Sequence, residues 1–280
     1  MTPAPSPAPF SDLSGRRTPE AVPGTLTSSN GVAETATYAL RLGDDALIGA
    51  QRMAEWIASA PQLEEDIAMG NIALDLLGQA RALLSYAGQV EGAGRDQDAL
   101  AYFRDERDFL NAQIFELAGG DFGRTMARLL ITSAYQFELY TRLQTSTDDT
   151  LAAVAAKAVK EVDYHRDHAT QWTLRLGDGT EESHRRMQQG LNDVLPYVAE
   201  LFETDDLVTS LAAEGTAVDP ATLLDPVMTY VDAVLAEATL ARPETTVVHT
   251  GGRRGIHTEQ FGYLIAEMQH LARSHPGAQW

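Results

Sequence analysis

From Tyr38 onward, apolar residues recur at the three- and four-residue spacings of amphipathic helices, and the sequence shows no strand-like alternation of any length. Prolines, glycines and capping residues mark where these helices begin and end. Pro196 is expected to bend one of them, and residues 242–255 are expected to form an irregular link. The expected helices span residues 44–59, 62–89, 97–117, 121–145, 148–176, 181–202, 220–240 and 258–274. The pattern therefore predicts an all-α protein.

The connections between the expected helices predict how they pack. Short turns join the helix over 44–59 to that over 62–89, and the helix over 121–145 to that over 148–176. Long helices joined by short turns lie antiparallel to each other. Two such hairpins, separated by an extra helix, predict a four-helix bundle with additional helices at its carboxyl end.

The amino-terminal segment has a different composition. Six of the twelve prolines fall within the first 23 positions, among Ala, Ser, Thr and Gly. Such a composition cannot bury enough apolar surface to offset the entropy lost on ordering. We expect residues 1–33 to be a disordered tail, and residues 34–280 to form one helical domain.

Charge and cysteine content exclude several function classes. The formal net charge is −19 and the sequence pI is about 4.6, which argues against binding of nucleic acid or an anionic membrane surface. The absence of cysteine excludes disulfides and thiolate metal sites. The sequence has neither an apolar run of about 20 residues nor a signal peptide pattern. We expect a cytoplasmic protein.

Three polar residues stand among apolar helix positions. Asp75 lies in the middle of the most apolar helix, Glu138 follows Ile131, Ala134 and Tyr135, and His165 shares a stripe with Val162 and Ala169. Polar groups at such positions are costly unless they are paired, so each of the three is expected to have a partner.

Inward carboxylates and histidines in a four-helix bundle suggest a di-iron site, which uses Glu-x-x-His pairs on two of its helices. Here that pattern is broken, because Gly78 stands three residues after Asp75 and Val162 stands three residues before His165. When the two helices fold back on each other at the turn near residue 147, Lys157 comes level with Glu138. Its ammonium would then replace the metal charge in a buried salt bridge. We interpret the region as a degenerate di-iron position without metal or catalytic residues, formed by Asp75, Glu138, Lys157, Glu161 and His165.

Several longer strings carry a resemblance to a known family. They are Leu40-Arg-Leu-Gly-Asp44, Asn71-Ile-Ala-Leu-Asp-Leu-Leu-Gly-Gln-Ala-Arg81, Phe103-Arg-Asp-Glu-Arg107, Ala156-Lys-Ala-Val-Lys-Glu161, Tyr164-His165, Thr250-Gly-Gly-Arg-Arg-Gly255, His257-Thr-Glu259, Ala266-Glu-Met-Gln269 and Pro276-Gly, ending in Trp280. In this order the strings resemble the family of ferritin-like structural subunits, designated C, of the multicomponent phenylacetyl-CoA 1,2-epoxidase, over about residues 37 to 280.

This resemblance implies a ferritin-like fold and a role in aerobic phenylacetate catabolism. It further implies that the chain is a non-catalytic structural subunit, which pairs with a related catalytic subunit of the same complex. That partner, designated A, holds the di-iron centre and epoxidises phenylacetyl-CoA with O₂. Electrons reach it from NADPH through a separate reductase that carries FAD and an iron–sulfur cluster. The chain itself is expected to bind no cofactor.

The resemblance also suggests residues that contact the catalytic di-iron subunit or the CoA moiety. Arg104, Arg107 and Asn111 recur at helical spacing and would present one polar face. The full set of candidates is Arg104, Arg107, Asp108, Phe109, Leu110, Asn111, Arg253 and Arg254. Two alternatives stay open: a di-iron oxygenase in its own right that uses Asp75, Glu138, Glu161 and His165, and a CoA-binding regulatory module without chemistry.

Overall fold

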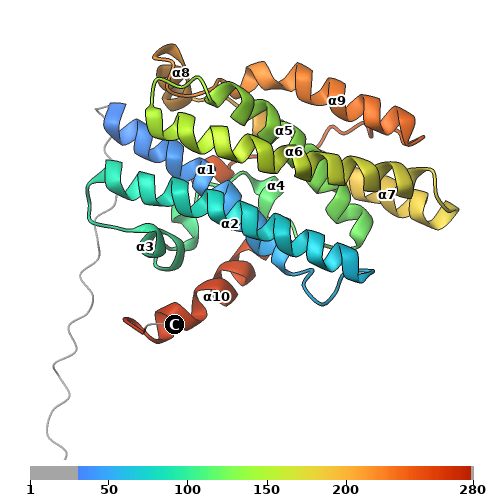
Figure 1. Ribbon diagram of the computed structural model, residues 1–280, viewed down its shortest axis with the longest axis horizontal. Helices are drawn as coiled ribbons and strands as arrows, with labels where there is room; N and C mark the ends of the chain where they lie inside the picture. Colours follow the sequence, from blue (N-terminus) through green and yellow to red (C-terminus); the bar gives the residue numbers. More distant parts are fainter. Residues whose placement is uncertain (1–30, 279–280) are drawn as a thin grey trace, which may run out of the picture.

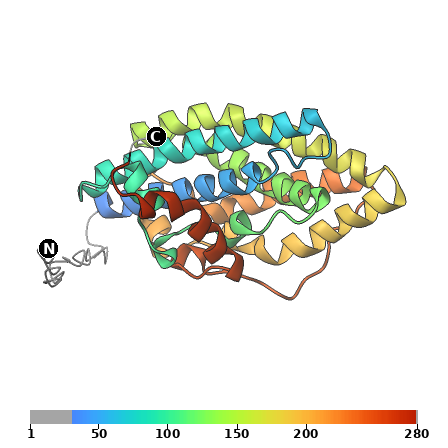
Figure 2. The ribbon, with the colours of Figure 1, turned by 90° about the horizontal axis from the view of Figure 1, so that it is seen from below.

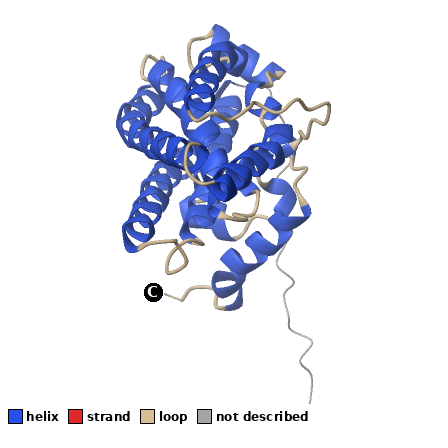
Figure 3. Ribbon diagram, turned by 90° about the vertical axis from the view of Figure 1, so that its right-hand side faces the viewer, coloured by secondary structure: helices blue, strands red, loops and turns tan. Residues whose placement is uncertain are grey.

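A computed structural model describes residues 31–278 of the chain, and this range contains helices but no strand (Figure 3). The α-helices are α1 (Gly31–Ala54), α2 (Leu63–Glu91), α3 (Gln97–Tyr102), α4 (Gln113–Glu116), α5 (Phe122–Leu143), α6 (Asp149–Gly177), α7 (Glu181–Val194), α8 (Asp206–Ala213), α9 (Leu224–Glu237) and α10 (Glu259–Ser274). The 3₁₀ turns are η1 (Glu106–Asp108), η2 (Leu195–Tyr197), η3 (Ala199–Phe202), η4 (Pro220–Leu223) and η5 (Gly252–Arg254). The predicted all-α class is confirmed.

Two antiparallel hairpins form the centre of the molecule (Figure 1). α1 packs along α2, α5 packs along α6, and α2 lies beside α6. The side chains of Ile72, Leu83, Leu130 and Val162 are buried where these helices meet. α7 and α9 pack against α5 and α6 from the other side. The fold is a ferritin-like four-helix bundle with additional carboxyl-terminal helices, as predicted.

The first helix is longer than the sequence suggested. α1 begins at Gly31 and continues through Gly43, whereas the pattern placed its start at Asp44. Gly43 is a close-packing position, because a Cβ atom there would lie 2.8 Å from Cδ2 of Leu84 in α2. The predicted tail boundary at residue 33 is therefore wrong for residues 31–33, and the rest of the predicted tail lies outside the described residues.

The predicted helix over 97–117 is wrong. Only α3, η1 and α4 are helical there, and extended backbone joins them. The backbone amides of Leu110 and Ala112 donate to the buried carboxylates of Asp44 and Asp45, at 2.8 and 2.9 Å. These bonds to a different helix replace the i to i−4 bonds that a continuous helix would need.

Elsewhere the differences are smaller. The helix predicted over 181–202 is regular to Val194 and then turns into 3₁₀ geometry at η2, which contains Pro196 as expected. α8 was not predicted, and the segment predicted over 220–240 is divided into η4 and α9. α10 agrees with the prediction to within one residue. Within the described range, no helix is both long and apolar enough to cross a membrane.

The carboxyl end of the chain crosses the segment between α3 and α5. We call residues 250–258 the C-terminal strap; it leads into α10, which packs on α3 and η1 (Figure 2). α10 lies away from the face that is formed by α2 and α6 (Figures 1 and 2). The strap brings the most distinctive sequence motifs against the first half of the chain.

Candidate functional site

The predicted degenerate metal position lies between α2 and α6. Oδ2 of Asp75 is 3.1 Å from Nε2 of His165, whose side chain is buried. One turn further along α2, Nε2 of Gln79 donates to Oε2 of Glu161 at 3.0 Å. The ammonium of Lys157 lies 3.1 Å from the other oxygen of the same carboxylate. Asp75, Glu161 and His165 therefore have partners, and Gln79 is a member that the sequence did not reveal.

Two parts of the prediction for this region are wrong. Glu138 is half-buried and pairs with Arg142 of its own helix at 3.3 Å. Lys157 does not form a buried salt bridge with it, because 71% of the Lys157 side chain is exposed. The ammonium instead lies over Gly78, 3.8 Å from where a Cβ atom would stand. The absent side chain at Gly78 leaves room for it.

The residues present do not fit a di-iron centre. Such a centre draws on four carboxylates and two histidines that point to one place. Within residues 31–278, no three His, Cys, Asp or Glu side chains are placed to hold a metal ion together. His168 meets Glu65 at 3.1 Å, and burial lowers the pKa of His168 below its usual value. The polar side chains between α2 and α6 thus meet as separate contacts along the two helices and do not converge on one point.

The segment from Arg104 to Asn111 is a structural joint. The guanidinium of Arg104 forms a two-pronged ion pair with Asp44, and both side chains are buried. The guanidinium also lies 4.1 Å from the ring centroid of Phe109, which is itself buried. Asn111 is buried and donates to Oε2 of Glu116 at 2.9 Å.

The expected contact role does not suit the buried residues of this segment. Arg104, Phe109 and Asn111 are buried, and Leu110 is half-buried. Arg107 and Asp108 are exposed on η1 and remain available to a partner. The polar face expected from helical spacing does not form, because the segment is not one helix.

Arg253 holds the strap to α1. Its guanidinium donates to both oxygens of Asp45, at 2.9 and 2.7 Å, and to the carbonyl of Leu110 at 3.0 Å. Burial raises the pKa of Asp45 to about 6, although the charge and hydrogen bonds of Arg253 oppose the rise. Arg254 is exposed and lies 4.0 Å from Glu203. The two arginines thus have different environments.

A second buried carboxylate fixes the other end of the strap. Glu116 accepts from Nδ1 of His257 at 2.7 Å and from the amide of Thr258 at 2.5 Å. Nε2 of His257 lies 2.9 Å from the carbonyl oxygen of Phe109. Burial alone would lower the pKa of His257, but the hydrogen bond and charge of Glu116 hold it above its usual value.

The glycines of the strap allow close backbone contact. A Cβ atom at Gly252 would stand 2.1 Å from the carbonyl oxygen of Asn111, and one at Gly255 would stand 2.1 Å from that of Arg107. The amides of Gly251 and Gly252 donate to Oε1 of Glu200, at 2.8 and 2.6 Å. The Thr250-Gly-Gly-Arg-Arg-Gly255 motif is thus explained by docking of the strap.

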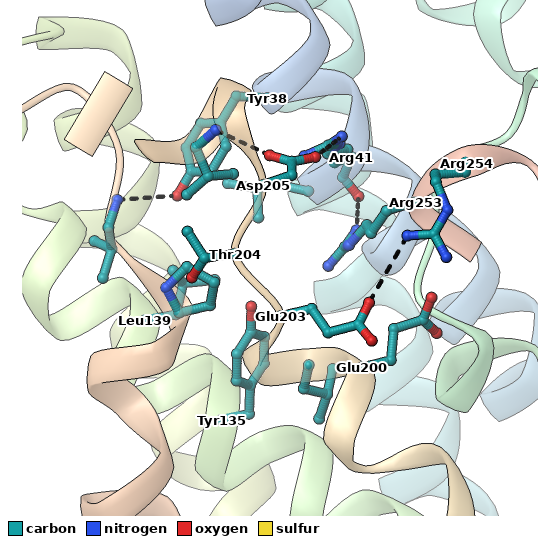
Figure 4. A pocket seen from close by; sticks show the side chains of 15 residues that line it. Tyr38, Arg41, Tyr135, Leu139, Glu200, Glu203, Thr204, Asp205, Arg253 and Arg254 are labelled. Carbon is teal, nitrogen blue, oxygen red and sulfur yellow. Dashed lines mark hydrogen bonds and ion pairs between the residues drawn. The ribbon is translucent and has the colours of Figure 1, made fainter. Parts of the chain in front are cut away.

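A pocket of about 330 Å³ opens beside the strap (Figure 4). Its charged side chains are paired: Arg41 bonds to Asp205 at 2.6 Å, and Arg254 approaches Glu203. The hydroxyl of Tyr38 accepts from the amide of Val218 at 3.4 Å. Tyr135, Thr204 and several aliphatic side chains also line the pocket. The pocket is balanced in charge, so it does not present the excess positive charge that the phosphates of CoA would require.

The sequence did not single out three residues that organise the joint, namely Asp45, Glu116 and Glu200. Each has partners between 51 and 208 positions away along the chain. One signal was present, because Asp44 and Asp45 are adjacent carboxylates within an otherwise apolar helical segment and must have partners when buried.

Comparison with known proteins places these features in a family. Residues 23–280 match the family model described as phenylacetic acid catabolic protein. The subunit designated C of the 1,2-phenylacetyl-CoA epoxidase of Escherichia coli strain K12 is 47% identical over 247 residues, which cover 88% of this chain and 99% of that protein. The motifs, the helical bundle and this similarity agree. The chain belongs to the phenylacetic acid catabolic protein family.

Proposed function

We propose that this chain is a non-catalytic structural subunit of a cytoplasmic phenylacetyl-CoA epoxidase complex, in which it supports a di-iron catalytic subunit. The observation that carries the proposal is the arrangement between α2 and α6. Asp75 is bonded to His165, and Glu161 is bonded to Gln79 and Lys157, so the polar atoms of these side chains are partnered within the chain. The family membership and the likeness to a named epoxidase subunit support the same role.

Under this proposal, the chemistry takes place elsewhere in the complex. The di-iron centre belongs to the catalytic subunit, and a reductase with FAD and an iron–sulfur cluster supplies electrons from NADPH. This chain contributes a rigid bundle whose carboxyl end is fastened by buried ion pairs. The pairing of its charged groups gives no support to a separate CoA-binding role.

Elemental analysis of iron tests the proposal. The chain purified alone should contain no stoichiometric iron, whereas its complex with the catalytic subunit should contain about two irons per pair. Replacing His165 by Ala should leave the iron content of the complex unchanged, because His165 serves Asp75 rather than a metal. About two irons per isolated chain, lost on His165→Ala, would instead establish an oxygenase in its own right.

A further inference from the structure

α2 exposes large apolar side chains on the side that faces away from the bundle. Leu63 is 71% exposed, Ile67 57%, Leu74 66% and Leu77 42%. We call these four residues the α2 stripe. Tyr164 of the neighbouring helix α6 is also exposed. Figures 1 and 2 show α2 and α6 together along one face of the molecule.

The spacing of the α2 stripe is that of a helix-packing seam. With Gly70 in the series, its positions follow one another at intervals of four, three, four and three residues. This repeat keeps side chains on one face of a helix and is the pattern of coiled-coil contacts. The opposite face of α2, with Ile72, Leu76 and Leu83, is already buried in the bundle. α2 therefore has one apolar face for its own bundle and another that points outward.

Charge is depleted along the α2 stripe. Between Glu64 and Arg81, the exposed residues of α2 are Ile67, Asn71, Leu74 and Leu77, and none carries a charge. The half-buried Asp75 is bonded to His165. The chain as a whole has a net charge of −19, so an uncharged surface of this length is a local exception. Depletion of charge is characteristic of the core of a protein interface.

The ends of the stripe carry opposite charges. Glu64 and Asp66 lie at the start of α2, whereas Arg81 lies beyond its apolar part. Lys157 of α6 lies over Gly78, near that second end, and Lys160 follows it one turn later. A helix that packs here is complementary when it places basic groups near the start of α2 and acidic groups near Arg81 and Lys157.

We propose that the α2 stripe is the surface on which this chain pairs with the catalytic subunit of its complex, through an apolar helix of that partner. This inference rests on the proposed function. Two copies of this chain would each bring a net charge of −19 to the contact, which opposes self-association. The relative is named as one subunit of an epoxidase, which favours a different chain as the occupant.

A matched pair of substitutions tests the surface. Leu77→Arg places a charge in the stripe, and Leu224→Arg places one at a position of α9 with nearly the same exposure, 44% against 42%. Leu77→Arg should raise the dissociation constant of the complex about 30-fold, as expected for an apolar contact that is buried in an interface. Leu224→Arg should leave it unchanged. Thermal unfolding of both free variants checks that the bundle is intact.

A second measurement needs no substitution. Lys157 and Lys160 are the only lysines of the chain, so an amine-acylating reagent read by mass spectrometry probes this face. Both lysines should react in the free chain, and their labelling should be lost in the complex.

The outcomes separate the two proposals. If the chain does not bind the catalytic partner, the proposed function fails. If it binds, but both arginine variants bind alike and the lysines still react, the α2 stripe is not the surface that contacts the catalytic subunit. Protection of the lysines in the free chain, by a second copy or by its own residues, also overturns the inference.

Discussion

At the residue scale, four buried carboxylates hold together the region around the C-terminal strap: those of Asp44, Asp45, Glu116 and Glu200. Each accepts hydrogen bonds from a distant part of the sequence, either from side chains or from backbone amides. A buried charge is tolerated when it is paired, and removal of one partner leaves the other uncompensated. The identity of these partners should therefore matter more than the exposed charges nearby.

Arg104→Ala should lower the free energy of unfolding by about 3–5 kcal/mol, because it leaves Asp44 buried without its guanidinium. Urea denaturation measures the change. Arg107→Ala is the matched control, since Arg107 is exposed on η1 and its loss should cost less than about 0.5 kcal/mol. Equal effects of the two substitutions would show that the Asp44–Arg104 pair is not a major source of stability.

The His257–Glu116 contact predicts a pH dependence. The pKa of His257 is raised above 6.5 in the folded state, so its contribution to stability is complete below pH 6.5 and is lost as pH rises through the folded pKa. Urea unfolding of the wild-type chain and of His257→Gln, from about pH 6.5 upward, should give a difference in free energy that shrinks with pH. A difference that is constant over this range would contradict the prediction.

The ionisation of Asp45 changes the stability of the fold at lower pH than that of His257, so the two effects on stability can be measured separately. Its pKa is raised from 3.8 to about 6, so ionisation of Asp45 costs folding free energy as pH rises between these values. Above this window Asp45 is ionised in both the folded and the unfolded chain. The His257 comparison therefore measures the imidazole when it is made above pH 6.5.

At the scale of elements, the C-terminal strap joins the last helix, α10, to α1 and to the segment between α3 and α5. It runs over the irregular segment between α3 and α5, and α10 packs beyond it on α3 and η1. The ring of Phe261 in α10 stacks on His257 at 4.1 Å between centroids, and it meets Phe109 edge-on at 5.6 Å. The strap and the segment beneath it form one joint, so neither should keep its conformation without the other.

Gly252→Ala tests this joint. The new Cβ atom would stand 2.1 Å from the carbonyl oxygen of Asn111, so the strap must move, and we expect a loss of about 1–3 kcal/mol in unfolding free energy. Gly70→Ala in α2 is the control, because nothing lies within 4 Å of its Cβ position. It should instead stabilise the helix by about 0.5–1 kcal/mol. Urea unfolding of both variants measures these changes. An unchanged unfolding free energy for Gly252→Ala would mean that the strap is not closely docked.

For the whole molecule, strong acidity is combined with an exposed apolar stripe on α2. The net charge of −19 opposes contact between copies of the chain, whereas no exposed residue of α2 between Glu64 and Arg81 carries a charge. Under the proposed function, this stripe is the surface through which the chain supports its catalytic partner. The iron analysis tests the proposed function, and the matched arginine variants test the α2 stripe.

The sequence predicted the helical part of the fold where local rules suffice. Periodicity, the caps at Asp121 and Asp148, and the short turns gave the two hairpins. Residues 97–117 were predicted wrongly, because helix propensity lost to hydrogen bonds with carboxylates on other elements. Near the candidate site, the broken Glu-x-x-His pattern was visible, and Lys157 and Glu161 are four residues apart on one helix, a spacing at which side chains meet. The bond from Gln79 to Glu161 joins two helices, so only the tertiary structure reveals it.

The sequence by itself determined that the chain is an all-α protein, which family it resembles, and which of its motifs are distinctive. The tertiary structure alone decided what those motifs do. Arg104, Asn111 and Arg253 looked like surface contacts, and they are instead inward partners of Asp44, Glu116 and Asp45. The 3.6-residue period of a helix is set by backbone hydrogen bonds between residues four apart, so it can be recognised in a short stretch of sequence. Pairing of buried charges joins residues far apart in sequence, so it exists only after the chain has folded.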